Sequence, residues 1–410
     1  MSDQITPLTL GRSVPAVADQ PPSATRSLTD DFKLGLEAPI CLTWELTYAC
    51  NLACRHCLSS SGRRDPAELS TAECFGVVDE LQRLGVFYVN LGGGEPMLRR
   101  DFFDIVEYST AHDVGVKFST NGTYIDPAAA RRLASMDYLD IQVSIDGATA
   151  AVNDHVRGQG SFATARTAMD NLAAADFGAF KISVVVTRQN VDQLDDFRAV
   201  ADEYGAQLRI TRLRPSGRGA DTWDELHPTQ QQQRDLYHWL LDRPDVLTGD
   251  SFFHLNALGS EQLPGLNLCG AGRVVCLIDP IGDVYACPFV IHDEFLAGNV
   301  RDQGGFTGVW KGSDLFTSLR EPTSAGACAS CGAYDACQGG CMASKFFVGL
   351  EMDDPDPECV LGHGETALAD KRAAGELVGV GSPPRPSQDH SRPGAAVPVG
   401  WTRSRHRSWR

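Results

Sequence analysis

Three cysteines within eight residues constrain this chain more than any other feature. Cys50, Cys54 and Cys57 have the spacing C-x3-C-x2-C, and they follow an apolar run over residues 40–46 that predicts a β-strand. Gly62 comes soon after them, which places the three thiols on a loop. A loop lets three side chains converge on one inorganic group, and thiolates are soft ligands that select iron–sulfur clusters, zinc or Cu(I).

The number of protein ligands distinguishes an iron–sulfur cluster from a structural zinc site on this loop. A structural zinc site has four protein ligands, whereas a catalytic metal site keeps one position open. No fourth cysteine occurs at a fitting distance, because Cys74 falls inside a helical pattern. Three cysteines on a four-iron cubane would leave one iron able to bind a small molecule through nitrogen and oxygen. The alternative is a zinc knuckle in which His56 is the fourth ligand.

Composition and charge argue against several classes of protein. The hydrophobic share of 42% and the charged share of 22% are those of an ordinary globular protein of 410 residues. The net charge is −17 and no basic stripe runs through the body of the chain, so no nucleic-acid partner is expected. No stretch approaches the ~20 apolar residues of a membrane helix, and residues 1–37 lack a signal-peptide pattern, so a cytoplasmic protein is expected.

The first half of the chain alternates strand patterns with helical patterns. Six such repeats with apolar strands predict a parallel sheet covered by helices. The candidate functional residues follow the strand ends, at the face where the loops of a parallel barrel build an active site. The predicted strands cover residues 41–46, 86–91, 116–119, 138–144, 181–186 and 207–212, and the helical patterns 71–84, 101–111, 127–134, 162–175 and 191–204.

Changes in composition divide the chain into five predicted segments. A helix from Thr229 to Leu241 is expected between the βα repeats and a second cysteine-rich region. The basic tail could contact an acidic partner, although a dispensable extension is favoured. The segments are a disordered N-terminal arm (1–37), the βα unit (38–215), a bridging segment (216–265), the cysteine-rich domain (266–365) and a disordered basic tail (371–410).

Eight of the 13 cysteines form a second set, whose core has the pattern C-x2-C-x5-C-x3-C. Gly-rich, β-poor flanks suggest a fold held together by metal, and eight thiolates supply two four-cysteine sites for zinc or for iron–sulfur clusters. Cys41 and Cys74 are left over, and we predict that they are buried small apolar residues. The eight are Cys269, Cys276, Cys287, Cys328, Cys331, Cys337, Cys341 and Cys359.

The cysteine loop, together with the turn Gly92–Pro96 (G-G-G-E-P) after the second predicted strand, resembles the radical S-adenosylmethionine (SAM) enzymes. The resemblance implies that Cys50, Cys54 and Cys57 hold a [4Fe–4S] cluster, whose fourth iron is chelated by the amine and carboxylate of SAM. It also implies an open, TIM-like (β/α)6 partial barrel that admits a bulky substrate such as a peptide. The chemistry implied is hydrogen abstraction by a 5′-deoxyadenosyl radical.

The same resemblance implies roles in SAM binding for residues near the strand ends. The alternative for the glycines and for Asn121 is a simple tight turn. The implied contacts are Gly93, Gly94 and Glu95 with the methionine part, Ser144 with the ribose, Arg157 with SAM, His56 with the adenine, and Ser119 and Asn121 as weaker candidates.

The second cysteine set, with Gly282 five residues before Cys287, resembles the SPASM extension of radical SAM enzymes that modify peptides. The resemblance implies two auxiliary [4Fe–4S] clusters that are fully ligated by cysteine and transfer electrons. One would be held by Cys269, Cys276, Cys287 and Cys341, and the other by Cys328, Cys331, Cys337 and Cys359. Zinc ribbons remain the alternative for these eight residues.

Longer stretches around both motifs, at residues 45–50, 57–65 and 87–96, closely resemble the mycofactocin maturases, and the likeness extends over about residues 38–365. That family oxidatively decarboxylates the C-terminal tyrosine of a small ribosomal precursor peptide. It then joins the product to the preceding valine through a carbon–carbon bond. The resemblance therefore implies SAM, three [4Fe–4S] clusters, a precursor peptide, a separate peptide-recognition protein and an electron donor.

Two other functions stay open. Pro288 follows Cys287 where sulfatase-maturing enzymes have an aspartate base, which argues against formylglycine formation but not against a thioether or another crosslink. A non-catalytic, zinc-stapled binding protein is the alternative from a different class, although it leaves the Gly92–Pro96 turn unexplained. No acid or base is identified, because Tyr48, Arg209 and Arg212, all near strand ends, can each be structural.

Overall fold

The central element of the protein is a nine-stranded sheet. The computed structural model describes residues 28–376 except 179, 250–251, 266 and 322–324. In this part of the chain the strands have the order β6-β5-β4-β3-β2-β1-β7-β8-β9. They are β1 (Cys41–Thr47), β2 (Tyr88–Gly93), β3 (Gly115–Thr120), β4 (Leu139–Ser144), β5 (Lys181–Val186), β6 (Gln207–Arg212), β7 (Val275–Ile278), β8 (Asp283–Tyr285) and β9 (Leu296–Asn299).

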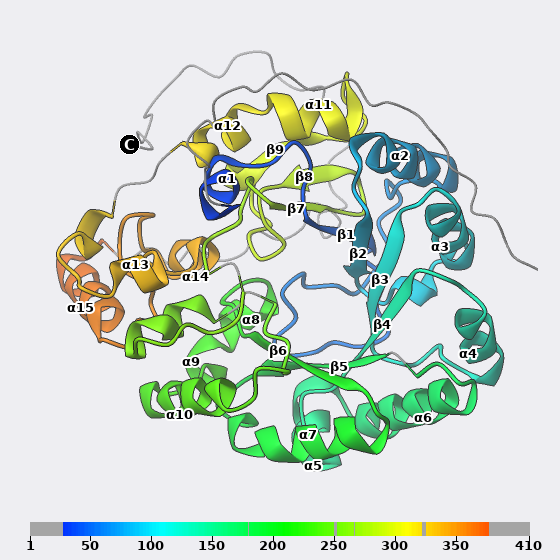
Figure 1. The fold of residues 1–410 in the computed structure, drawn as a ribbon, viewed down its shortest axis with the longest axis horizontal. Helices are drawn as coiled ribbons and strands as arrows, with labels where there is room; N and C mark the ends of the chain where they lie inside the picture. Colours follow the sequence, from blue (N-terminus) through cyan, green and yellow to red (C-terminus); the bar gives the residue numbers. More distant parts are fainter. Residues whose placement is uncertain (1–27, 179, 250–251, 266, 322–324, 377–410) are drawn as a thin grey trace, which may run out of the picture.

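Strands β1 to β6 are parallel, and helices cover their outer side (Figure 1). β7 pairs with β1 in parallel, whereas β8 and β9 continue the sheet as antiparallel strands. The helices are α1 (Leu28–Leu34), α2 (Thr71–Leu84), α3 (Phe102–Ala111), α4 (Pro127–Ala134), α5 (Ala150–Arg157), α6 (Ser161–Ala174), α7 (Leu194–Glu203), α8 (Arg218–Asp221), α9 (Trp223–Leu226), α10 (Gln230–Leu241), α11 (Gly305–Gly312), α12 (Asp314–Arg320), α13 (Tyr334–Cys337), α14 (Met342–Phe347) and α15 (His363–Ala374).

Local sequence signals fix where several helices begin. Ser70 and Glu73 form a capping box at the start of α2, and Thr229 and Gln232 form another at the start of α10. Asp126 caps α4 by accepting hydrogen bonds from two backbone amides, and a proline occupies the first helical position. The helix predicted from Thr229 to Leu241 is therefore confirmed.

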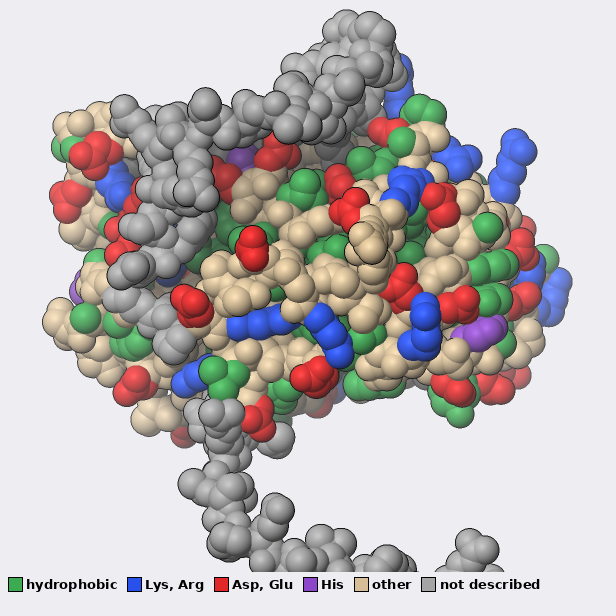
Figure 2. All heavy atoms as spheres, turned by 90° about the horizontal axis from the view of Figure 1, so that it is seen from above, with side chains coloured by type: hydrophobic (Ala, Val, Ile, Leu, Met, Phe, Trp, Pro, Cys, Tyr) green, Lys and Arg blue, Asp and Glu red, His purple; other side chains and the backbone are tan. Residues whose placement is uncertain are grey.

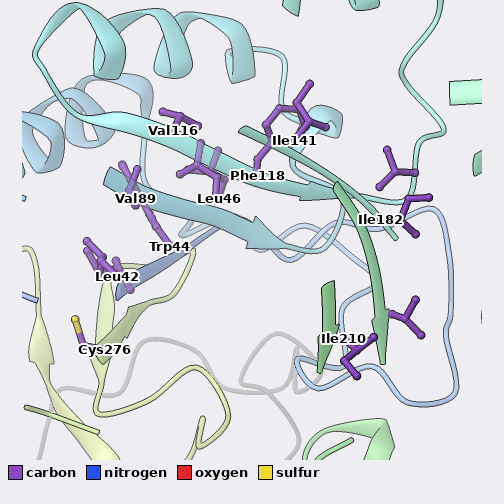
Figure 3. Close-up of a cluster of buried hydrophobic side chains, with 14 of the residues drawn as sticks. Leu42, Trp44, Leu46, Val89, Val116, Phe118, Ile141, Ile182, Ile210 and Cys276 are labelled. Atoms are coloured by element: carbon purple, nitrogen blue, oxygen red, sulfur yellow. The ribbon is translucent and has the colours of Figure 1, made fainter. Parts of the chain in front are cut away.

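Alternation along the strands separates an apolar face from a polar one. Leu42, Trp44 and Leu46 of β1 are buried under the helices, in the cluster drawn in Figure 3. The intervening Thr43 and Glu45 therefore point to the opposite face, which is the interior of the open barrel. The carboxyl ends of β1 to β6 form the mouth of this barrel.

The expected fold, a parallel sheet in a partial barrel, is confirmed. The prediction missed α5, because it assigned only one helix, 162–175, between β4 and β5. It also did not anticipate β7 to β9. Of these three strands, β7 extends the barrel sheet directly.

The expectation that all of 1–37 is disordered is wrong for the residues that the structure describes. Residues 28–34 form α1, and the chain after it is held by hydrogen bonds. The Leu36 amide donates to the carbonyl of Arg273 at 3.0 Å, and the Trp310 indole donates to the carbonyl of Leu36 at 3.1 Å. Residues 1–27 lie outside the described residues.

The basic tail was predicted to start at residue 371, which is also wrong. Helix α15 continues to Ala374, and Gly375 ends it in the left-handed conformation that favours glycine. The rest of that segment, 377–410, lies outside the described residues.

The face shown in Figure 2 has acidic and basic side chains interspersed, without a continuous basic stripe. The absence of a nucleic-acid partner stays a prediction. In the described part of the chain, none of the helices has both the length and the apolar character that crossing a membrane requires.

Candidate active site and auxiliary cysteine sites

The first cysteine loop leaves the end of β1 and is fixed at both ends by backbone hydrogen bonds. The Cys50 amide donates to the carbonyl of Gly62 at 3.0 Å, and the Gly62 amide donates to the carbonyl of Tyr48 at 2.8 Å. Farther along, the Arg218 amide donates to the carbonyl of Cys57 at 2.9 Å. The loop is thus tied to the barrel mouth.

The three thiols of this loop lie close together. Burial raises the pKa of the Cys54 thiol to about 11, and the neighbouring Cys57 and Cys50 thiols add to this. A group of partly buried thiols is costly to ionise unless a positive metal centre binds it, so the donor set fits an iron–sulfur cluster. Ligation itself stays a prediction.

His56 lies between these cysteines and points to a buried carboxylate. Its Nε2 is 2.6 Å from Oδ2 of Asp146, and His56 is only 8% exposed. Its Nδ1 is buried without a hydrogen-bond partner among the described residues. The contact with adenine stays a prediction.

Asp146 also binds Arg157, which ends α5. The Arg157 Nε lies 2.6 Å from the same Oδ2, and the other carboxylate oxygen accepts a hydrogen bond from the Val185 amide at 2.8 Å. Burial would raise the pKa of Asp146, but Arg157 and His56 outweigh it and hold the pKa well below its usual range. Asp146 lies two residues after the end of β4. The structure makes it the residue that joins two predicted SAM contacts.

The glycine turn packs against the backbone that enters the cysteine loop. The Gly94 amide donates to the carbonyl of Thr47 at 2.8 Å, and the Glu95 amide donates to the carbonyl of Ala49 at 2.8 Å. A Cβ atom on Gly94 would lie 1.9 Å from the carbonyl oxygen of Ala49, so only glycine fits there. The turn and the cysteine loop therefore hold each other in place.

Glu95 is buried and fully engaged within the protein. Its carboxylate accepts hydrogen bonds from the Thr120 hydroxyl at 2.9 Å and from the Asn121 amide at 2.8 Å, both at the end of β3. Burial raises the pKa of Glu95 to about 7. These contacts orient the Gly93–Glu95 turn, whereas its contact with SAM stays a prediction.

The remaining predicted SAM contacts lie at the same mouth. Ser119, next to the last residue of β3, and Ser144, the last residue of β4, lie on the interior face, since they alternate with the buried Phe118 and Val143. Asn121 donates through its side chain to Asn51 Oδ1 at 2.9 Å, which connects the end of β3 to the cysteine loop. Asn121 is thus more than a turn residue.

The second cysteine set separates into two groups in space. Cys287 lies near Cys341 and Cys269, and Cys276 lies near Cys287. Burial, followed by Cys341 and Cys269, raises the pKa of Cys287 above its usual range. The second group lines one small cavity and consists of Cys328, Cys331, Cys337 and Cys359. Burial, followed by the other three thiols, raises the pKa of Cys337 to about 11. The structure brings together the same residues that the resemblance assigned to two ligand sets, whereas the ligation of clusters by them stays a prediction.

The two leftover cysteines differ. Cys74 is fully buried in α2, as predicted. Cys41 is only partly buried and lies beside Cys276, because it starts β1 directly opposite Val275 of β7. The expectation that Cys41 is a buried apolar residue is therefore wrong.

Charged side chains connect the end of β6 to the auxiliary cysteines. Arg214 is buried, and its Nε donates to the Cys341 sulfur at 3.4 Å. Arg212 forms buried ion pairs with Asp356 and Glu358, and Asp356 accepts a hydrogen bond from the Cys341 amide at 2.7 Å. Sequence reasoning left Arg212 open and missed Arg214, because their partners lie more than 120 residues away in the chain.

Tyr48 and Arg209 also have structural contacts. The Tyr48 hydroxyl donates to Asp279 Oδ2 at 2.5 Å, which joins the end of β1 to the turn between β7 and β8. Burial raises the pKa of Asp279 to about 7. Arg209 donates to the Ser183 hydroxyl at 3.3 Å across β5 and β6.

Comparison with known proteins decides the family. Residues 44–201 match the model of the radical SAM superfamily, and residues 269–332 match that of an iron–sulfur cluster-binding domain named SPASM. The mycofactocin maturase MftC of Mycobacterium ulcerans (strain Agy99) is 67% identical over 372 residues, which cover 90% of this chain and 98% of that protein. The chain belongs to the mycofactocin maturase family of radical SAM enzymes.

Other relatives agree with this assignment. The maturase MftC of Mycolicibacterium smegmatis (strain ATCC 700084 / mc(2)155) is 66% identical, over 91% of this chain and 93% of that protein. Among solved structures, SuiB of Streptococcus suis bound to S-adenosylmethionine has a TM-score of 0.62 at 17% identity, covering 79% of this chain and 77% of that one. The structure of anSMEcpe with AdoMet and a peptide has a TM-score of 0.57 at 17% identity, covering 82% and 99%. These two support the fold of this maturase.

Proposed function

We propose that this maturase acts on the C-terminal tyrosine of a small ribosomal precursor peptide. In the first step the tyrosine loses a hydrogen atom from Cβ, one electron and CO2, which leaves a carbon–carbon double bond. In the second step the resulting unit is joined to the preceding valine through a carbon–carbon bond. The observation that carries this proposal is the 67% identity to a mycofactocin maturase over 98% of that protein's length.

The proposed mechanism assigns distinct tasks to the residues at the barrel mouth. Cys50, Cys54 and Cys57 would hold a [4Fe–4S] cluster, which with SAM supplies the hydrogen-abstracting radical. Glu95 fixes the glycine turn against β3, and Asp146 fixes the side chains of His56 and Arg157 beside the cysteines. The residues thereby keep SAM and the peptide in one orientation, which is the main contribution that a protein makes to such chemistry.

We also propose three clusters, a separate peptide-recognition protein and an external electron donor, in a cytoplasmic setting. The two auxiliary groups would be Cys269, Cys276, Cys287 and Cys341, and Cys328, Cys331, Cys337 and Cys359. One auxiliary cluster would accept the electron that leaves with CO2. Arg214, which donates to the Cys341 sulfur, supports this role for the first group, because hydrogen bonds to cluster sulfurs tune reduction potential.

The test is anaerobic purification followed by iron and sulfide analysis and turnover with SAM, a reductant and the precursor peptide. We expect about twelve irons per chain, formation of 5′-deoxyadenosine and a peptide lighter by CO2 and two hydrogen atoms. Loss of hydrogen alone would favour a thioether or another crosslink. Zinc in place of iron, with SAM unchanged, would refute the enzyme proposal.

A further inference from the structure

The interior face of the barrel carries a polar cluster below the mouth. It consists of Asn90 on β2, Lys117 on β3, and Asp140 and Gln142 on β4. Asn90, Lys117 and Asp140 are register partners across three adjacent strands, and Gln142 pairs with Ser119. Their neighbours along each strand, such as Val89, Phe118 and Ile141, point to the helices and are fully buried (Figure 3).

Several polar atoms of this cluster are buried and unpaired. Asn90 Oδ1, Asp140 Oδ1 and Gln142 Nε2 have no hydrogen-bond partner among the described residues, and Gln142 is 1% exposed. Leaving such an atom unpaired is unfavourable, so three in one place indicate that a ligand completes them. Lys117 adds a donor; burial first, and then Arg209, lower its pKa to about 8.

The unpaired atoms include both donors and acceptors. A hydroxyl group donates one hydrogen bond and accepts others, so it can satisfy an oxygen of Asn90 or Asp140 together with Lys117 or Gln142. A carboxylate only accepts, so it would leave the Asn90 and Asp140 oxygens unpaired, whereas the charge of Asp140 is already paired with Lys181. The cluster therefore fits a hydroxyl better than the carboxylate of a peptide terminus.

The depth of the cluster fits one particular hydroxyl. Lys117 lies two residues before Ser119 on β3, which is about 6.6 Å farther from the mouth along the strand. A tyrosine side chain spans a similar length from its Cβ to its phenol oxygen. If the reacting Cβ lies at the mouth beside the cysteine loop, the phenol reaches this row.

We infer that Asn90, Lys117, Asp140 and Gln142 form the binding site for the phenol of the substrate's C-terminal tyrosine. This inference rests on the proposed function, because that function places the Cβ of tyrosine at the mouth. A site built to bind a hydroxyl rejects the analogue that lacks it, because the buried polar groups are then left unpaired. We expect the enzyme to discriminate strongly against a peptide that ends in phenylalanine.

The experiment compares two precursor peptides, one ending in tyrosine and one in phenylalanine, with the full-length enzyme carrying its clusters. The ratio of kcat/KM is measured by competition, and the ratio of dissociation constants by fluorescence anisotropy of labelled peptides. We expect the wild-type enzyme to favour tyrosine by about 10²-fold or more in kcat/KM. In Lys117→Met the ratio falls to about 10 or less, because the tyrosine peptide loses a partner and the phenylalanine peptide does not.

Asn90→Leu is the second variant, and it should lower the ratio in the same direction without changing the net charge. Lys311→Met is the control, since Lys311 is half-exposed on α11 and pairs only with Glu37 in the described part of the chain. Its ratio should equal that of the wild type. The iron content of each variant shows whether it retains its clusters.

Two results with the wild type would overturn the inference: equal kcat/KM for both peptides, or equal dissociation constants for both. A third is an equal fold-decrease of kcat/KM on both peptides in Lys117→Met and Asn90→Leu. Failure of the proposed function gives a different result, in which neither peptide is decarboxylated although SAM is cleaved. The binding ratio then still decides whether the phenol is recognised.

Discussion

Replacing Asp146 by asparagine removes the charge that joins His56 to Arg157. Its Oδ2 lies 2.6 Å from both partner nitrogens, and Asp146 is fully buried. The side chain of Arg157 is 11% exposed, so in the variant its guanidinium stays buried without the carboxylate that pairs with it. Removing one partner of a buried pair typically destabilises a protein by about 3–5 kcal/mol. We expect Asp146→Asn to lose free energy of unfolding in this range.

The assay is anaerobic urea unfolding of the reconstituted enzyme, followed by tryptophan fluorescence, together with the dissociation constant of SAM. Asp202→Asn is the matched control, because Asp202 pairs with Arg198 at the surface, where both side chains are at least one-third exposed. That control should change stability by less than about 1 kcal/mol. Only Asp146→Asn should also weaken SAM binding.

A double variant separates the loss of the pair from the presence of an unpaired charge. Adding Arg157→Met to Asp146→Asn removes the buried guanidinium, so part of the lost stability should return. SAM binding should not return, because both positioning groups are then absent. The reasoning is refuted if Asp146→Asn loses no more free energy of unfolding than Asp202→Asn. It is also refuted if adding Arg157→Met lowers the stability further instead of restoring part of it.

Three further predictions concern other parts of the chain. Gly94→Ala should destabilise the enzyme by about 1–3 kcal/mol in urea unfolding, because the added Cβ has no space. Gly92→Ala adds a Cβ that has nothing within 4 Å, so it should change the free energy of unfolding by less than about 1 kcal/mol. Equal effects of the two substitutions would contradict the packing argument. Arg214→Met should shift the reduction potential of one cluster to more negative values, because the Cys341 sulfur loses a hydrogen bond. The measurement is a redox titration followed by EPR, at unchanged iron content. An unchanged potential would show that Arg214 does not tune the cluster. Hydrogen bonds from Arg301 lower the pKa of Glu73 to about 2. The stabilising contribution of Glu73 is therefore complete above about pH 4.5 and is lost as the pH falls through about 2. Glu73→Gln should remove this pH dependence from the free energy of unfolding, and an unchanged dependence would show that another group causes it.

Features that depend on local sequence could be predicted well. The six barrel strands have an apolar pattern along their own length, and Ser70, Asp126 and Thr229 are capping residues next to the helices that they start. Both cysteine motifs are also local, so their spacing alone indicated metal chemistry. The resemblance to a known family then added the ligand grouping, which the positions of the thiols match.

Features that depend on distant partners could not be predicted. Asp146 meets His56 across 90 residues, and Arg214 meets Cys341 across 127 residues. No local pattern distinguishes such a buried charge from one at the surface. The strands β7, β8 and β9 have only three or four residues each, which is too short for a period-2 pattern to stand out.

The pairing of β1 with β7 has a consequence for electron transfer. β1 leads directly into the first cysteine loop, and its Leu42 is the register partner of Cys276, which belongs to the first auxiliary group. The Tyr48 hydroxyl adds a second connection at the other end of β1, where it donates to Asp279. The distance between the two cysteine sites is therefore set by strand pairing and not by a flexible linker. A rigid separation would keep the electron path constant through both steps of the proposed reaction.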